Sequence, residues 1–133
     1  MDFIETVRSK AQQLQRNLVL PEGTEPRTIQ AARILVDEKL AATVTLLGKP
    51  DAVTQAAGAT GTGLDGIEIV DPVRSDRLEA YAAEYVELRK HKGMTLEDAR
   101  AGLSDPLKWG AMMVRMGDAD AMVAGAENAT SNV

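Results

Sequence analysis

Residues 17–47 read NLVLPEGTEPRTIQAARILVDEKLAATVTLL, and this stretch decides the fold class. It opens with a short apolar run at 17–20, which Pro21 stops, and a run of that length suits a buried strand. Residues 26–39 begin with a proline, which suits the first position of a helix, and then repeat apolar side chains at helical spacing. The β-branched run at 43–47 predicts a second strand. The order strand, helix, strand is typical of a βαβ unit.

The rest of the chain continues this alternation in both directions. Further helices are predicted at 2–15, 50–57, 75–92 and 95–102 and from Asp105-Pro106 onward, and further strands at 67–70 and 121–124. Strands that alternate with helices predict an α/β fold with a mainly parallel sheet covered on both faces. We therefore expect a three-layer α/β/α sandwich.

Length, charge and cysteine content exclude several classes of function. A chain of 133 residues fits one domain. Without cysteine it has no disulfide, no zinc–thiolate site and no thiol nucleophile, and we expect no metal site. A net charge of −5 argues against general nucleic-acid binding. The sequence has neither a signal-peptide pattern nor an apolar run long enough to span a membrane, so a cytoplasmic protein is expected.

Two basic features are candidates for binding a ligand. Arg27 follows the first strand and lies near a helix N-terminus, where a cation is electrostatically unfavourable. This position indicates an anion or carboxylate partner, and an ion pair with Glu22 or Glu25 is an equally good interpretation. Arg89 begins the basic run 89–93, which complements the C-terminal end of a helix and could also clamp a phosphate. Spacing alone favours the helix-end interpretation.

The final loop offers hydroxyl and amide groups after the last predicted strand. Thr130 and Ser131, with Asn128 and Asn132 beside them, precede the place where a helix is expected. Hydroxyls and backbone N–H groups at a helix start can bind an anion, but these residue types are also ordinary helix caps.

Three stretches of the chain resemble a known family. They are LPEGTEPRT at 20–28, YVELRKHKGMT at 85–95 and DAMVAGA at 120–126. Their sequences and spacing are similar to those of the phosphate acetyltransferases of the phosphate acetyl/butyryl transferase group. The resemblance covers the whole chain but less than half of a typical family member.

The resemblance implies a two-domain acyltransferase with a cleft between its α/β domains. In that family acetyl phosphate reacts with coenzyme A (CoA) to give acetyl-CoA and phosphate, by direct attack of the CoA thiolate and without a covalent acyl-enzyme. CoA is a substrate, and no cofactor is implied. By resemblance Arg89 lies near the phosphates of CoA, Thr130 and Ser131 lie beside acetyl phosphate, and Arg27 lines the cleft.

Part of the family pattern is missing. Family members continue with a substrate-binding Leu-Arg-Pro motif, whereas this chain ends at Val133. The aspartate that activates the thiol lies farther downstream in the family. We therefore expect residues 1–133 to be the N-terminal domain, without catalytic residues and inactive alone, of an enzyme that is a homodimer when full length. The alternatives are a phosphate butyryltransferase, an acetyltransferase-like domain fused to a malic enzyme, and a non-catalytic module that binds a phosphate ligand.

Overall fold

A four-stranded parallel sheet forms the centre of the computed structural model, which describes residues 2–125. The strands lie in the order β3-β2-β1-β4, and every neighbouring pair is parallel. Their bounds are Asn17–Leu20 for β1, Thr43–Leu47 for β2, Glu68–Val70 for β3 and Ala121–Met122 for β4. The parallel sheet confirms the fold class predicted from the alternating pattern.

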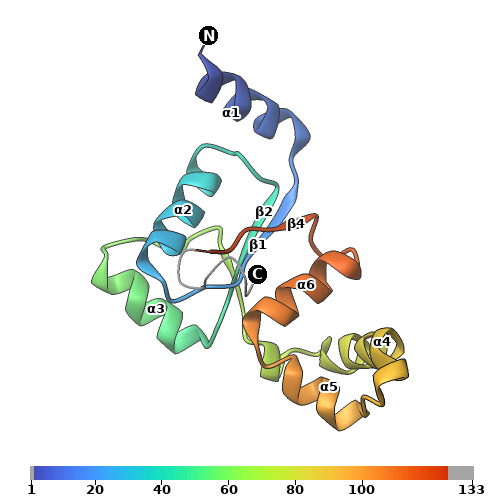
Figure 1. Cartoon of the computed structure of the whole chain (residues 1–133). Helices are drawn as coiled ribbons and strands as arrows, with labels where there is room; N and C mark the ends of the chain where they lie inside the picture. The colour runs from blue at the N-terminus through green and yellow to red at the C-terminus, as the bar shows by residue number, and fades with distance from the viewer. Residues whose placement is uncertain (1, 126–133) are drawn as a thin grey trace.

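Helices cover both faces of the sheet (Figure 1). Their bounds are Phe3–Leu14 for α1, Pro26–Asp37 for α2, Pro50–Ala59 for α3, Leu78–Arg89 for α4, Leu96–Gly102 for α5 and Pro106–Arg115 for α6. Helices α2 and α3 pack on one face, and α4, α5 and α6 lie on the other. The molecule is therefore the three-layer α/β/α sandwich that the sequence predicts.

Adjacent strand residues contribute to two separate cores. Leu46 is fully buried against α2 and α3, whereas the next residue, Leu47, is buried against α6 and its neighbours. This alternation follows from the strand geometry, in which successive side chains point to opposite faces. Each fully buried apolar side chain of this size stabilises the fold by about 1.5–3 kcal/mol. Burial on both faces thus fixes β1 and β2 at the centre of the sheet.

The segment after β3 departs from the sequence-based expectation of one helix at 75–92. It consists of a 3₁₀ turn, η1 (Pro72–Arg74), then α4, then a second 3₁₀ turn, η2 (Lys90–Lys92). The Ser75 hydroxyl accepts a hydrogen bond from the Arg77 N–H at 3.1 Å, and such local bonds compete with helix formation. Gly93 ends η2 with a φ of 72°, a left-handed conformation that glycine adopts without steric cost. Arg89 therefore ends the α-helix itself.

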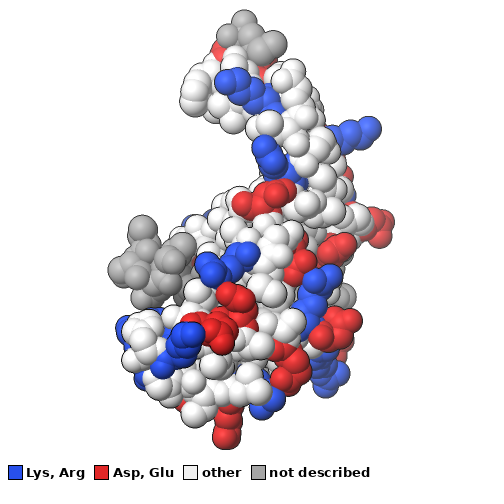
Figure 2. Space-filling model, turned by 90° about the vertical axis from the view of Figure 1, so that its right-hand side faces the viewer, with Lys and Arg blue, Asp and Glu red and all other residues white. Residues whose placement is uncertain are grey.

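Helix α1 projects from the rest of the molecule (Figures 1 and 2). None of its residues is buried, and Phe3 is 78% exposed. Polar contacts join it to the end of α2: Arg8 Nη1 donates to Glu38 Oε1 at 2.9 Å, and Gln12 Nε2 donates to the Glu38 carbonyl at 2.8 Å. The fold of the two cores thus depends little on α1.

Candidate functional site

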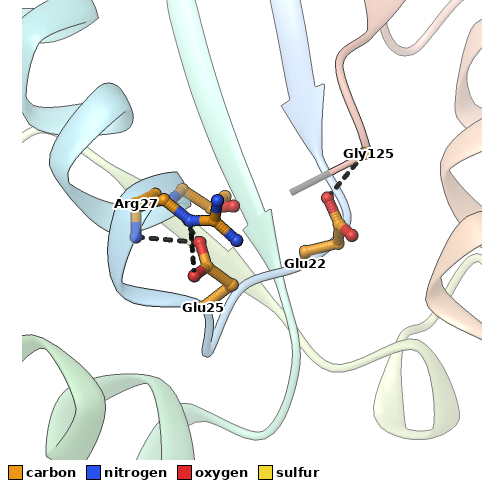
Figure 3. Close-up of polar contacts among 5 residues, drawn as sticks. Glu22, Glu25, Arg27 and Gly125 are labelled. Carbon is orange, nitrogen blue, oxygen red and sulfur yellow. Dashed lines mark hydrogen bonds and ion pairs between the residues drawn. The ribbon is translucent and has the colours of Figure 1, made fainter. Parts of the chain in front are cut away.

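The loop after β1 packs tightly against the ends of its two neighbouring strands (Figure 3). Glu22 is only 5% exposed, and its Oε1 accepts a hydrogen bond at 2.9 Å from the N–H of Gly125, beyond β4. On the other side, a Cβ at Gly23 would lie 2.2 Å from the carbonyl oxygen of Leu47, so only glycine fits there. These contacts hold the carboxyl ends of β1, β2 and β4 together. This edge is where open α/β sheets bind ligands.

Arg27 forms an ion pair with Glu25, which was one of the two interpretations of the sequence (Figure 3). Its Nε lies 3.0 Å from Glu25 Oε1, and Glu25 also caps α2 by accepting hydrogen bonds from the Arg27 and Thr28 N–H groups at 2.8 and 3.1 Å. Desolvation of the Glu25 carboxylate would raise its pKa. The bonds from Arg27 and Thr28 outweigh this effect and hold the pKa below its ordinary value. The carboxylate therefore stays charged and offsets a cation at the helix start.

A small hollow of about 130 Å³ lies beside this ion pair. It is lined by Leu20, Glu22, Arg27, Thr28, Ala31, Val123 and Ala124. The Arg27 side chain is 72% exposed, so it remains accessible to solvent while it is paired with Glu25. Arg27 thus lines a hollow at the ligand edge, and its place in a cleft between two domains stays a prediction. Thr130 and Ser131 lie outside the described residues.

A larger hollow, of about 390 Å³, lies at the end of α4. Arg89 lines it together with Tyr85, Lys92, Gly93, Met94, Asp98 and Lys108. Figure 1 shows α4 and α5 at the opposite end of the molecule from α1, which precedes the first strand. The hollow thus lies toward the carboxyl ends of the strands. Cations around an open hollow there can bind an anionic ligand.

Sequence reasoning missed Lys108 and the hydrogen bond that Glu22 makes. Lys108 lies in the first turn of α6, where the helix dipole disfavours a cation, as it does for Arg27 in α2. The same sequence pattern could therefore have identified Lys108. Glu22 was considered only as a partner for Arg27. Its bond to Gly125 joins residues 103 positions apart, and no local pattern predicts such a contact.

Two structural features are absent from residues 2–125. Within this range the acidic and histidine side chains form no group of three that could hold a metal ion. None of the helices described here has the length and apolar character needed to cross a membrane.

Comparison with known proteins identifies the family. The family model "Phosphate acetyl/butaryl transferase" matches residues 2–133. The phosphate acetyltransferase of Thermoanaerobacterium thermosaccharolyticum is 42% identical over 133 residues, which are 100% of this chain and 40% of the relative. That of Acetivibrio thermocellus is 44% identical over 132 residues, 99% of this chain and 39% of the relative. The chain thus spans about 40% of the length of these curated relatives.

Solved structures agree with the sequence comparison. A phosphotransacetylase from Streptococcus pyogenes superposes with a TM-score of 0.90 at 32% identity, covering 99% of this chain and 40% of that protein. One from Staphylococcus aureus superposes with a TM-score of 0.86 at 30% identity, covering 96% of this chain and 38% of that protein. The described fold is thus that of a phosphotransacetylase domain. The chain belongs to the phosphate acetyl/butyryl transferase family.

Proposed function

We propose that residues 1–133 are the N-terminal domain of a phosphate acetyltransferase, which transfers acetyl reversibly between acetyl phosphate and CoA. The observation that carries this proposal is the family match across residues 2–133, with relatives that are themselves phosphate acetyltransferases. Those relatives favour an acetyl over a butyryl substrate. The reaction proceeds by direct attack of the CoA thiolate on the acetyl carbonyl, which agrees with a chain that contains no cysteine.

In this proposal the chain supplies substrate-binding groups. Arg89 binds a phosphate of CoA, and Arg27 lines the cleft at the end of β1. The remainder of the enzyme supplies the groups that activate the thiol. Arg89 is suited to its role because it is exposed and lines the 390 Å³ hollow at the end of α4. Its planar guanidinium can present two parallel N–H donors to phosphate oxygens.

Arg89→Ala in a full-length enzyme that contains this chain is expected to raise the KM for CoA by ten- to a hundredfold. A charge-assisted hydrogen bond to phosphate contributes about 1.5–3 kcal/mol, which corresponds to about that change in affinity. The KM for acetyl phosphate should change little. Steady-state kinetics with each substrate varied in turn make the measurement, and Arg89→Lys should restore part of the affinity.

Lys90→Ala is the matched control for Arg89→Ala. Lys90 is the next residue along and carries the same charge, but its Nζ pairs with Glu87 Oε2 at 3.2 Å and it does not line the hollow. Lys90→Ala should leave the KM for CoA within about twofold of the original value. If Arg89→Ala lowers only the melting temperature and leaves the KM for CoA unchanged, Arg89 only stabilises the C-terminal end of the helix, and its proposed role in binding CoA is wrong.

Thr130 and Ser131 are proposed to hold the phosphoryl end of acetyl phosphate. The double change Thr130→Ala/Ser131→Ala in the full-length enzyme is expected to cost about 2–4 kcal/mol of transition-state stabilisation, because one or two hydrogen-bond donors are lost. The loss should appear in kcat/KM for acetyl phosphate, and the KM for CoA should stay nearly constant. Near-normal kcat/KM in the double variant would mean that these hydroxyls only cap a helix.

A further inference from the structure

Glu22, in the loop after β1, is the one charged residue among residues 2–125 that is buried, with 5% of it exposed. A carboxylate loses its hydration when it is buried, and this loss is costly unless hydrogen bonds or cations replace the water. A position that only had to fill space would be better occupied by an apolar side chain. The buried carboxylate therefore indicates a role that an apolar side chain cannot fill.

Glu22 fixes the chain at the point where it leaves β4 (Figure 3). Its Oε1 accepts a hydrogen bond from the Gly125 N–H at 2.9 Å. A hydrogen bond to a charged acceptor is roughly twice as strong as one between neutral groups. The ladder between β4 and β1 covers only two residue pairs, and the Val123 N–H adds one bond to the Val19 carbonyl at 3.0 Å. Because this ladder is short, the bond to Glu22 contributes strongly to fixing Gly125.

The backbone conformation of Gly125 makes the following residues depend on this bond. Its φ is 115°, a value that residues with a side chain rarely adopt. A glycine can take many other conformations, because it has no Cβ to limit them. The hydrogen bond to Glu22 selects one of these conformations. The direction of the chain beyond Gly125 is therefore set by the place of the Glu22 carboxylate.

The backbone around Glu22 leaves this carboxylate little freedom to move. The Glu25 N–H donates to the Glu22 carbonyl at 3.1 Å and closes a turn. A Cβ at Gly23 would lie 2.2 Å from the carbonyl oxygen of Leu47, so the loop runs directly against the end of β2. Pro21, on the other side of Glu22, is fully buried. Glu22 is thus a fixed point from which Gly125 is held.

We propose that Glu22 is a positioning residue for acetyl phosphate: its carboxylate holds Gly125 and so directs the segment that contains Thr130 and Ser131. The proposal rests on the function given above, in which these two hydroxyls bind the phosphoryl end of acetyl phosphate. A displacement of about 1 Å in a substrate-binding group can cost about a hundredfold in rate. Glu22 acts as a hydrogen-bond acceptor for the backbone, and it neither gains nor loses a proton in the reaction.

Glu22→Ala in a full-length enzyme that contains this chain is expected to lower kcat/KM for acetyl phosphate by about ten- to a hundredfold, because Gly125 is no longer held in place. The KM for CoA should stay within about twofold of its original value, since Glu22 does not line the hollow that contains Arg89. Steady-state kinetics with each substrate varied in turn measure both effects.

Two further variants separate the reach of the Glu22 side chain from its charge. Glu22→Gln keeps the length and an acceptor oxygen but loses the charge. It should retain kcat/KM for acetyl phosphate within about fivefold, with an unchanged pH profile, because a neutral acceptor still holds the N–H. Glu22→Asp keeps the charge but is one methylene group shorter, so it should lose nearly as much as Glu22→Ala. Glu22→Asp also replaces Glu22→Ala in the test if the alanine variant does not fold.

Thr45→Ala is the control for a general loss of stability. Thr45 is also a buried polar residue, 3% exposed, and its Oγ1 donates to Glu68 Oε2 at 3.4 Å. It lies in β2 and lines a hollow with Tyr81 and Trp109, on the side of the sheet that α4 and α6 cover. The control variant should melt at a lower temperature but keep kcat/KM for acetyl phosphate within about twofold.

A last comparison introduces Glu22→Ala into the Thr130→Ala/Ser131→Ala enzyme. If Glu22 acts by positioning these hydroxyls, its loss should cost less than about threefold in this background, because the effects of coupled residues do not add. An equal cost of Glu22→Ala in both backgrounds would overturn the proposal.

The other variants can also contradict it. The proposal is wrong if Thr45→Ala lowers kcat/KM as much as Glu22→Ala, if Glu22→Gln is as impaired as Glu22→Ala, or if Glu22→Asp is fully active. If the change at Thr130 and Ser131 lowers kcat/KM but Glu22→Ala does not, this inference fails and the proposed function stands. If the unaltered enzyme forms no acetyl-CoA from acetyl phosphate, the proposed function itself fails.

Discussion

The purified 133-residue chain is expected to fold but to form no acetyl-CoA from acetyl phosphate and CoA. It spans about 40% of the length of its phosphate acetyltransferase relatives. By resemblance to the family, the thiol-activating aspartate and the arginine of the Leu-Arg-Pro motif belong to the remainder of the enzyme. Catalysis requires such groups to be in place together, because residues that act as a unit lose most of their effect when one is absent. Thioester formation followed by absorbance makes the measurement.

Two controls make this negative result informative. The full-length enzyme of Thermoanaerobacterium thermosaccharolyticum, assayed at the same concentration, shows that the assay detects turnover. A far-ultraviolet circular dichroism spectrum typical of an α/β protein shows that the chain is folded. Turnover by the chain at a rate near that of the full-length relative would contradict the proposal that the catalytic groups lie elsewhere.

Trp109→Ala is expected to lower the free energy of unfolding by about 3–5 kcal/mol. Trp109 is 1% exposed in the core under α6, and its ring lies 4.5 Å from that of Tyr81, at an interplanar angle of 41°. Truncation leaves a cavity next to Tyr81, whose hydroxyl donates to Asp118 Oδ2. Burial raises the pKa of Tyr81, and the hydrogen bond to Asp118 raises it further by a smaller amount. The hydroxyl therefore stays protonated over the ordinary pH range. A loss of this size is a large part of the stability of a small domain.

Denaturant unfolding should be followed by circular dichroism, because Trp109 is the one tryptophan of the chain and its fluorescence disappears with it. Trp109→Phe keeps an aromatic ring against Tyr81 and should cost clearly less than Trp109→Ala. Met116→Ala is the control beside α6: Met116 is 39% exposed, so its truncation should cost less than about 1 kcal/mol. A loss below about 1 kcal/mol for Trp109→Ala as well would show that this core does not hold α6 to the sheet.

Strong local signals allowed the central elements to be predicted from the sequence. The apolar runs gave β1 and β2 at their observed bounds, and Pro26, Thr95 and Asp105 marked helix starts that the structure confirms. Each of these signals is contained within a few neighbouring residues, as strand runs and helix caps are.

Features that depend on distant contacts were predicted less well. The strand expected at 121–124 is limited to Ala121–Met122, because β4 is an edge strand whose register with β1 covers only two residue pairs. The bond from Gly125 to Glu22 and the position of Lys108 at the hollow depend on how the loops and helices pack. The basic run at 89–93 was recognised from the sequence, but Lys108, which α6 adds to the lining of the same hollow, was not.

We propose that this chain binds CoA at the hollow where α4 ends, and the decisive experiment is a titration of the isotopically labelled chain with CoA, followed residue by residue through its amide chemical shifts. Saturable amide shifts are expected, centred on Arg89, Gly93 and Lys108, which line the hollow, and Arg89→Ala should lose most of this response. Shifts that do not saturate, that centre on another part of the sheet, or that persist unchanged in Arg89→Ala would contradict it.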